Sequence, residues 1–148
     1  MTKSFTILLL ALFLISCSSD DDNGLNNTEN ANELILGTWK KITETLDGSQ
    51  VTQNICELQE RYSYDTSGNF VELYYGNTNT TEPCGNLAEN TGPYSISGIE
   101  ITFTLGGDAF VQKIQNISST ELVLKEVYID EEGIAFTYVE TYEKINNN

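Results

Sequence analysis

The feature that most limits what this chain can fold into is a strict alternation of apolar and polar residues along much of its length. It is clearest over residues 99–105, where apolar side chains at every second position alternate with polar ones: Ile99, Ile101, Phe103 and Leu105 against Glu100, Thr102 and Thr104. Such alternation predicts a β-strand with one buried face and one face in water.

Similar segments recur about every ten residues from residue 37 onward, separated by turn residues. The other predicted strands cover residues 38–45, 58–64, 70–75, 93–97, 110–117, 122–129 and 134–144. Turn signals such as Asp47-Gly48 and Gly106-Gly107-Asp108 lie between them. The sequence therefore predicts eight consecutive antiparallel strands and an all-β fold.

The apolar face of this sheet has to be covered. The best helix candidate, residues 30–36 with Asn30 as N-cap, makes only about two turns and is too short to cover a sheet. We therefore predict an eight-stranded antiparallel up-and-down barrel with a short N-terminal helix. A barrel of this size is either filled by side chains or wide enough for one small ligand. A two-sheet sandwich is the alternative.

Composition excludes several classes of function. The 148 residues suffice for one domain, with 22 acidic side chains against 7 basic ones and no histidine. Nucleic-acid binding relies on lysine and arginine, which are scarce here, so no nucleic-acid partner is expected. Without histidine there is no histidine-based triad or common zinc site. We predict no enzymatic activity, no cofactor and no metal.

The N-terminus has the pattern of a signal peptide. Lys3 precedes an apolar run from Phe5 to Ile15, which is 11 residues long, whereas a membrane-spanning helix needs about 20. We interpret residues 1–16 as a signal peptide.

Leu14-Ile15-Ser16-Cys17 resembles the lipobox of bacterial lipoproteins, which implies that Cys17 is acylated and anchors the protein to a membrane. Ser18-Ser19-Asp20-Asp21-Asp22 resembles the export signal of Bacteroidetes-type lipoproteins, which implies the outer membrane and the cell surface. A plain acidic tether, with the protein on the periplasmic face, is the alternative. We expect residues 17–32 to form an acylated, disordered acidic tether and residues 33–148 to form the domain.

The other two cysteines are expected to pair. If the turn after residue 64 is centred near Ser67, Cys56 lies beside the end of the partner strand, and Cys84 follows a few residues later. With Cys17 carrying lipid, Cys56 and Cys84 would form a disulfide in an oxidising compartment. A reactive thiol pair is the alternative.

Gly37-Thr38-Trp39 follows the short helix and opens the first strand. With the strands that come after it, this motif resembles the lipocalin-like domains of bacterial lipoproteins over about residues 33–145. The resemblance implies that Trp39 plugs the closed end of the barrel. It also implies that Lys144, at a position where lipocalins usually have arginine, covers the tryptophan through a cation–π contact.

If even-numbered positions of the last strand face inward, they form a candidate ligand site with residues from neighbouring strands. This candidate set is Tyr62, Phe103, Leu124, Glu126, Phe136, Tyr138 and Glu140. Glu60 lies two positions before Tyr62 on the same predicted strand and would face inward with it. Buried carboxylates without partners are costly, so an interior position would imply a cationic or polar ligand, water or a raised pKa. We favour the alternative, in which a bulge turns these carboxylates outward or they lie at the open rim.

These expectations give two candidate functions. The first is an envelope-anchored lipoprotein that binds a small apolar or amphipathic ligand in the barrel. The alternative is a filled, non-enzymatic barrel that recognises a protein or polysaccharide through its loops, with residues 76–92 as the main loop. The sequence names neither the ligand nor a protein partner.

Overall fold

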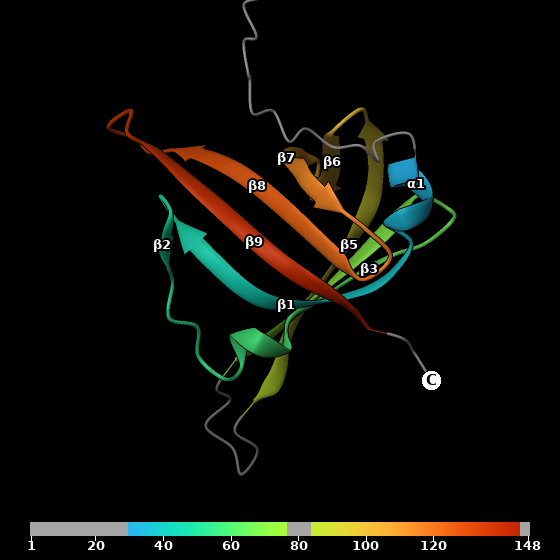
Figure 1. The fold of residues 1–148 in the computed structure, drawn as a ribbon, viewed down its shortest axis with the longest axis horizontal. Coiled ribbons are helices and arrows are strands. Elements are labelled where there is room, and N and C mark those ends of the chain that lie inside the picture. The colour runs from blue at the N-terminus through green and yellow to red at the C-terminus, as the bar shows by residue number, and fades with distance from the viewer. Residues whose placement is uncertain (1–29, 77–83, 146–148) are drawn as a thin grey trace, which may run out of the picture.

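The computed structural model describes residues 30–76 and 84–145 (Figure 1). The predicted signal peptide, Cys17 and most of the predicted tether lie outside these residues. Within the described ranges, no helix has the length and apolar character needed to span a bilayer.

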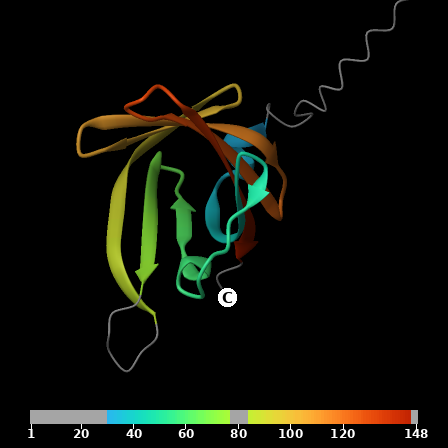
Figure 2. The same ribbon diagram turned by 90° about the vertical axis from the view of Figure 1, so that its left-hand side faces the viewer.

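One antiparallel sheet closes on itself into a barrel, as Figure 2 shows. The barrel strands are β1 (Gly37–Leu46), β3 (Arg61–Tyr64), β4 (Asn69–Gly76), β5 (Gly85–Ser97), β6 (Glu100–Leu105), β7 (Asp108–Ile117), β8 (Glu121–Ile129) and β9 (Ala135–Ile145). Each pairs with the next, and β9 pairs with β1. The predicted eight-stranded barrel is confirmed, and the sandwich alternative is wrong. A short additional strand, β2 (Ser49–Gln50), forms a hairpin with the end of β1.

The helix before β1 is shorter than predicted. Helix α1 is Ala31–Leu34, and Asn30 stands at its N-cap position without a capping hydrogen bond from its side chain. Ala31 is 1% exposed and Ile35 is fully buried. The packed domain therefore begins a few residues before the predicted boundary at residue 33, because α1 is part of the core.

Two strands begin at least three residues away from their predicted starts, and the other strand boundaries differ by no more than two residues. The segment predicted as a strand from residue 58 begins as a 3₁₀ turn, η2 (Glu57–Gln59), and becomes β3 only at Arg61. Strand β5 begins at Gly85, well before the predicted residue 93, because its Asn- and Gly-containing first half pairs with β4 along Tyr75↔Asn86 to Phe70↔Gly92. Strand pairing here overrides weak local β-propensity. Most of the predicted loop is thus strand, and residues 77–83 lie outside the described residues.

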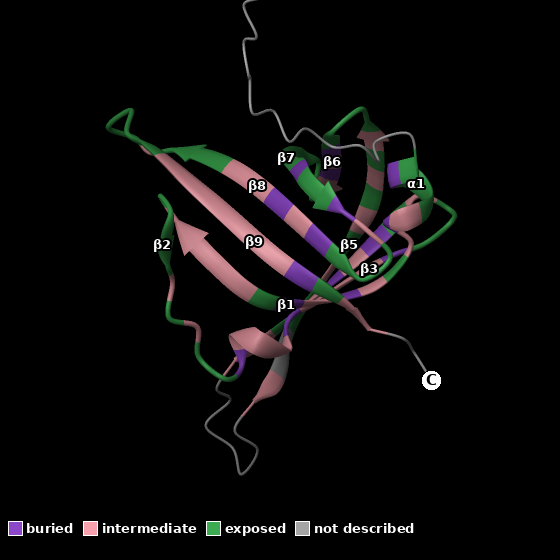
Figure 3. Ribbon diagram, viewed as in Figure 1, coloured by how far each residue is buried: buried purple, intermediate pink, exposed green. Residues whose placement is uncertain are grey.

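The core fills the half of the barrel next to α1. The largest fully buried side chains are Trp39, Tyr142, Phe70, Ile35, Ile101, Ile114, Ile117, Leu122 and Leu124. Figure 3 shows that the β8–β9 hairpin tip is exposed, while the buried stretches of both strands lie away from that tip. The two ends of the barrel are therefore packed differently.

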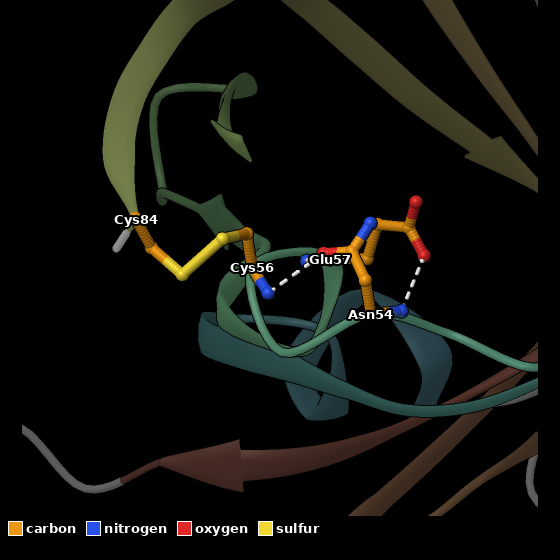
Figure 4. The surroundings of a disulfide bond; sticks show 4 residues. All are labelled: Asn54, Cys56, Glu57 and Cys84. Atoms are coloured by element: carbon orange, nitrogen blue, oxygen red, sulfur yellow. Dashed lines mark hydrogen bonds between the residues drawn. A yellow bond between two sulfur atoms is a disulfide. The ribbon is translucent and has the colours of Figure 1, made fainter. Parts of the chain in front are cut away.

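The predicted disulfide is present between Cys56 and Cys84, whose Cα atoms are 5.2 Å apart (Figure 4). It joins the residue before η2 to the residue before β5. Local hydrogen bonds support this turn. The backbone N–H of Cys56 donates to Asn54 Oδ1 at 2.8 Å, and the backbone N–H of Asn54 donates to Glu57 Oε2 at 2.9 Å. The two cysteines are 28 residues apart in the sequence. Closing a loop of that length stabilises a fold by about 3.5 kcal/mol in the chain-entropy treatment.

Candidate functional site

The closed end of the barrel is built around Trp39. Its side chain is fully buried, and its indole N–H donates to the Ile35 carbonyl at 2.6 Å. Lys144 lies directly across from Trp39 on β9, with Nζ 4.9 Å from the ring centroid, and donates to the Leu34 carbonyl at 2.9 Å. Trp39 thus packs between α1 and Lys144 and does not line the cavity, as expected for a structural plug.

A cavity of about 600 Å³ occupies the barrel beyond this core, toward the β8–β9 tip. Ligand pockets in proteins commonly have volumes of about 300–1,000 Å³. Six side chains that are charged at neutral pH line it, namely Lys41, Glu44, Glu60, Glu72, Glu126 and Glu140. Its other walls are Tyr62, Phe70, Tyr74, Phe103, Leu105, Phe110, Gln112, Tyr128 and Tyr138.

A β-bulge in β1 turns charged side chains into this cavity. The register with β9 shifts between Lys41 and Thr43, so that Lys41 lies opposite Tyr142 and Glu44 lies opposite Glu140. Before the bulge Lys41 shares the inward face with Trp39, and after it Glu44 faces inward although it is an odd number of residues away. Two carboxylates therefore oppose each other across β1 and β9, with an ammonium between them.

Lys41 holds three carboxylates together. Its Nζ lies 2.7 Å from Glu60 Oε2, 2.8 Å from Glu140 Oε1 and 3.4 Å from Glu44 Oε2. The side chains of Lys41 and Glu60 are each 8% exposed. Burial alone would lower the pKa of Lys41, but the negative charges of Glu140 and Glu60 outweigh burial and raise it. Burial raises the pKa of Glu60, and Lys41 only partly opposes this rise.

The other two carboxylates have hydrogen-bond donors but no ion pair among the described residues. Glu72 is 4% exposed and accepts from the Tyr62 hydroxyl and from Asn90 Nδ2, the latter at 3.0 Å. Glu126 accepts from Gln112 Nε2 at 3.1 Å. The cavity therefore has more negative than positive groups.

The apolar wall lies on the other side of the barrel. Strand β6 contributes Phe103 and Leu105, and β7 contributes Phe110. The ring of Phe103 packs edge-on against Phe70, with centroids 5.0 Å apart. Most of the charged groups come from the paired strands β9 and β1, from β4, and from Glu60 just before β3. The cavity is thus amphipathic: β6 and β7 provide mainly apolar side chains, whereas β9, β1 and β4 provide most of the charged ones.

Apart from Glu60 Oε2, which Lys41 contacts, two buried side-chain polar atoms have no hydrogen-bond partner among the described residues. Gln112 lines the cavity, and its Oε1 is buried without a donor. The hydroxyl of Tyr64 is also without a partner, and the residue is 3% exposed. Burial raises the pKa of Tyr64, and the charges of Glu72 and Glu140 raise it further, but Tyr64 belongs to the packed core and does not line the cavity.

Comparison with known families decides the relationship of the chain. The family described as "Lipocalin-like domain" matches residues 35–124. The chain belongs to this lipocalin-like family. A comparison with curated proteins finds no match.

Solved structures similar to this lipocalin-like chain include three mammalian proteins. Bovine odorant-binding protein, in complex with a selenium-containing odorant, is 16% identical with a TM-score of 0.47, over 79% of this chain and 74% of that chain. The bovine lipocalin allergen Bos d 2 is 15% identical with a TM-score of 0.49, over 79% and 77%. Aphrodisin, a sex pheromone from female hamster, is 14% identical with a TM-score of 0.45, over 76% of each.

Five of the seven candidate residues line the cavity of this lipocalin-like barrel: Tyr62, Phe103, Glu126, Tyr138 and Glu140. Leu124 does not, because it lies deeper, in the packed core at 1% exposure. Phe136 does not line the cavity either, although its pairing partner on β8, Tyr128, does. The interpretation that the carboxylates turn outward or lie at the rim is wrong for Glu140 and Glu60, because Lys41 binds both inside the barrel.

The candidate set predicted from the sequence did not include several residues that line the cavity. Lys41 is two positions from Trp39 and Glu72 is two positions from Phe70, so strand alternation places each on the inward face of its strand. Glu44 could not be found this way, because the bulge changes the inward parity. Among the residues described, no group of three or more His, Cys, Asp or Glu is arranged to hold a metal ion.

Proposed function

We propose that this protein binds one small amphipathic molecule inside its barrel. The observation that carries the proposal is the cavity of about 600 Å³ with a charged side and an apolar side. A barrel filled by side chains would leave room for a few waters only, whereas this volume corresponds to about twenty. We propose binding without catalysis, since the chain has no histidine to serve as a general base.

A fluorescent apolar probe tests this proposal. Titrating the purified full chain with N-phenyl-1-naphthylamine should give a saturable rise in fluorescence with one site per chain. Leu105→Trp places a large ring in the cavity and should abolish the rise. Thr102→Trp is the matched control, because Thr102 lies on the outer face of the same strand and should leave binding unchanged. No saturable rise, or equal losses in both variants, would argue against a ligand site in the barrel.

We further propose that Cys17 carries lipid and anchors the barrel in the outer membrane, facing the cell exterior. The support is the lipobox-like Leu14–Cys17 and the acidic residues that follow it. Cys17→Ala should move the protein out of the membrane fraction, while Ser19→Ala should not. Replacing Asp20, Asp21 and Asp22 by alanine should keep the protein in the membrane but remove it from the surface of intact cells. Unchanged surface labelling of the variant would show that these acidic residues carry no address information, and no labelling of the unaltered protein would instead support the periplasmic face.

A second candidate function has one observation in its favour. Apolar side chains are exposed toward the open end of the barrel: Val111, Val127, Ile129 and Ile134 are all at least half exposed. Such a surface is consistent with a module that docks onto a partner. This function predicts that Val127→Ser impairs partner binding without changing probe fluorescence.

A further inference from the structure

The geometry of the cavity points to a particular class of ligand: we infer that it is an organic amine, in which a protonated nitrogen with N–H donors is joined to a short apolar group. This inference rests on the proposed function, because it specifies what the barrel cavity binds. It follows from three observations, which concern charge, an unpaired acceptor and the placement of the apolar wall.

The charge of the cavity is unbalanced. Five carboxylates and one ammonium line it, so its formal charge at neutral pH is 1 − 5 = −4. Lys41 contacts three of the carboxylates and neither Glu72 nor Glu126. A buried carboxylate is costly without a positive partner, and Glu72 is only 4% exposed. A ligand cation would supply the charge that Lys41 does not.

An unpaired acceptor on the wall of the cavity calls for a donor. Gln112 uses Nε2 to donate to Glu126, and that carboxylate fixes the orientation of the amide. Oε1 of Gln112 is therefore a buried acceptor on the wall of the cavity, with no donor among the described residues. An ammonium group offers several N–H donors, whereas a carboxylate ligand offers none.

The apolar wall accounts for the rest of the ligand. Phe103, Leu105 and Phe110 lie on β6 and β7, across the barrel from Lys41 and Glu140 on β1 and β9. A molecule with its cationic group near Glu72 or Glu126 can place its apolar group against these rings. A metal ion is a poorer match, because among the described residues no group of three or more His, Cys, Asp or Glu is arranged to hold one, and the three carboxylates that do meet already surround the Lys41 ammonium. An anionic ligand would be repelled by the carboxylates.

Calorimetric titration of the purified full chain with three matched probes tests the inference. Hexylamine, hexan-1-ol and hexanoate share an apolar chain and differ in the charge of the head group. Hexylamine should bind at least about tenfold more tightly than hexan-1-ol, as a hydrogen-bonded charge commonly gives. Hexanoate should not bind measurably.

Variants assign the effect to the cavity. Glu72→Gln removes a charge while keeping an acceptor for Asn90 or Tyr62, and it should weaken hexylamine binding about tenfold without changing hexan-1-ol binding. Glu126→Gln, a second variant at a more accessible position, should act in the same direction. Glu100→Gln is the control. The substitution removes the same charge from the protein, but Glu100 is exposed on the outer face of β6 and away from the cavity.

The outcomes separate the inference from the proposed function. If hexan-1-ol binds as tightly as hexylamine, the inference is overturned while the barrel remains a ligand site. If Glu100→Gln weakens hexylamine binding as much as Glu72→Gln, the attraction comes from the overall negative charge, and the inference is again overturned. If neither these probes nor N-phenyl-1-naphthylamine binds, both the inference and the proposed function fail.

Discussion

At the scale of single residues, the interior of this barrel depends on Lys41. It is the one ammonium among the described residues that line the cavity, and its neighbour Lys40 lies on the outer face with a looser ion pair to Glu143 at 3.7 Å. The two adjacent lysines therefore offer a matched pair of sites, one in a buried network and one in solvent.

Replacing Lys41 should destabilise the fold far more than replacing Lys40. Lys41→Met keeps the side-chain volume but leaves Glu60, Glu140 and Glu44 without their cation, which should cost about 3–5 kcal/mol. Lys40→Met removes an exposed pair and should cost less than about 1 kcal/mol. Urea unfolding at neutral pH measures both values. Similar values for the two variants would show that the buried network contributes little.

The inward position of Lys41 could be predicted from the sequence, and that of Glu44 could not. Lys41 shares a strand face with Trp39, so the same alternation that places the tryptophan inside also places the lysine there. Glu44 lies inside only because of the bulge, which depends on pairing between β1 and β9. A bulge is decided by contacts between distant segments and leaves no clear mark in the local pattern.

At the scale of elements, the sequence predicted strands best where one face is buried. Residues 99–105 alternate cleanly, and β6 (Glu100–Leu105) follows this pattern closely. The first half of β5 was not predicted, because it contains Asn90, Thr91 and Gly92 and is ordered by pairing with β4. Gly92 is required there, since a Cβ atom would lie 2.1 Å from the Thr104 carbonyl oxygen.

The connection from α1 to β1 depends on another glycine. Gly37 has φ +114°, and a Cβ atom there would lie 2.9 Å from Lys144 Cε. Gly37→Ala should therefore cost about 1–3 kcal/mol from backbone strain, plus the cost of moving Lys144 off Trp39. Gly107→Ala is the control for strain alone, because Gly107 has φ +102° and open space around it. Urea unfolding should show a larger loss for Gly37→Ala, and equal losses would contradict a role for the Lys144 contact.

At the scale of the whole molecule, the barrel has a packed end and a hollow end. The packed end holds Trp39 and Tyr142, and the hollow end holds charged groups that a purely structural core would not contain. Sequence alternation predicts the barrel and several of its inward-facing residues. It does not predict the cavity, because the volume left empty depends on how all eight strands pack together.

The tyrosines near the boundary between these ends make stability sensitive to alkali. Burial, reinforced by neighbouring carboxylates, raises the pKa of Tyr62, Tyr64 and Tyr142 well above the ordinary value of about 10. The folded state then binds more protons than the unfolded state above about pH 10, so stability should fall as pH rises through this range. The raised pKa of Lys41 acts in the same direction. Its contribution to the free energy of unfolding is complete below about pH 10.4 and declines as the pH rises further.

Urea midpoints between about pH 8 and about pH 11 measure this fall. Tyr64→Phe should reduce its steepness, since it removes a titrating hydroxyl that has no hydrogen-bond partner. A midpoint that stays constant up to about pH 11 would show that these hydroxyls ionise as freely in the folded protein as in the unfolded chain.

The central claim, that the barrel holds a small molecule, is tested most directly by native mass spectrometry of the protein purified from its own host. The account predicts one additional small mass per chain, lost on unfolding and absent from Leu105→Trp. The bare mass of the protein in every preparation, with the fold intact and the cavity open, would contradict it.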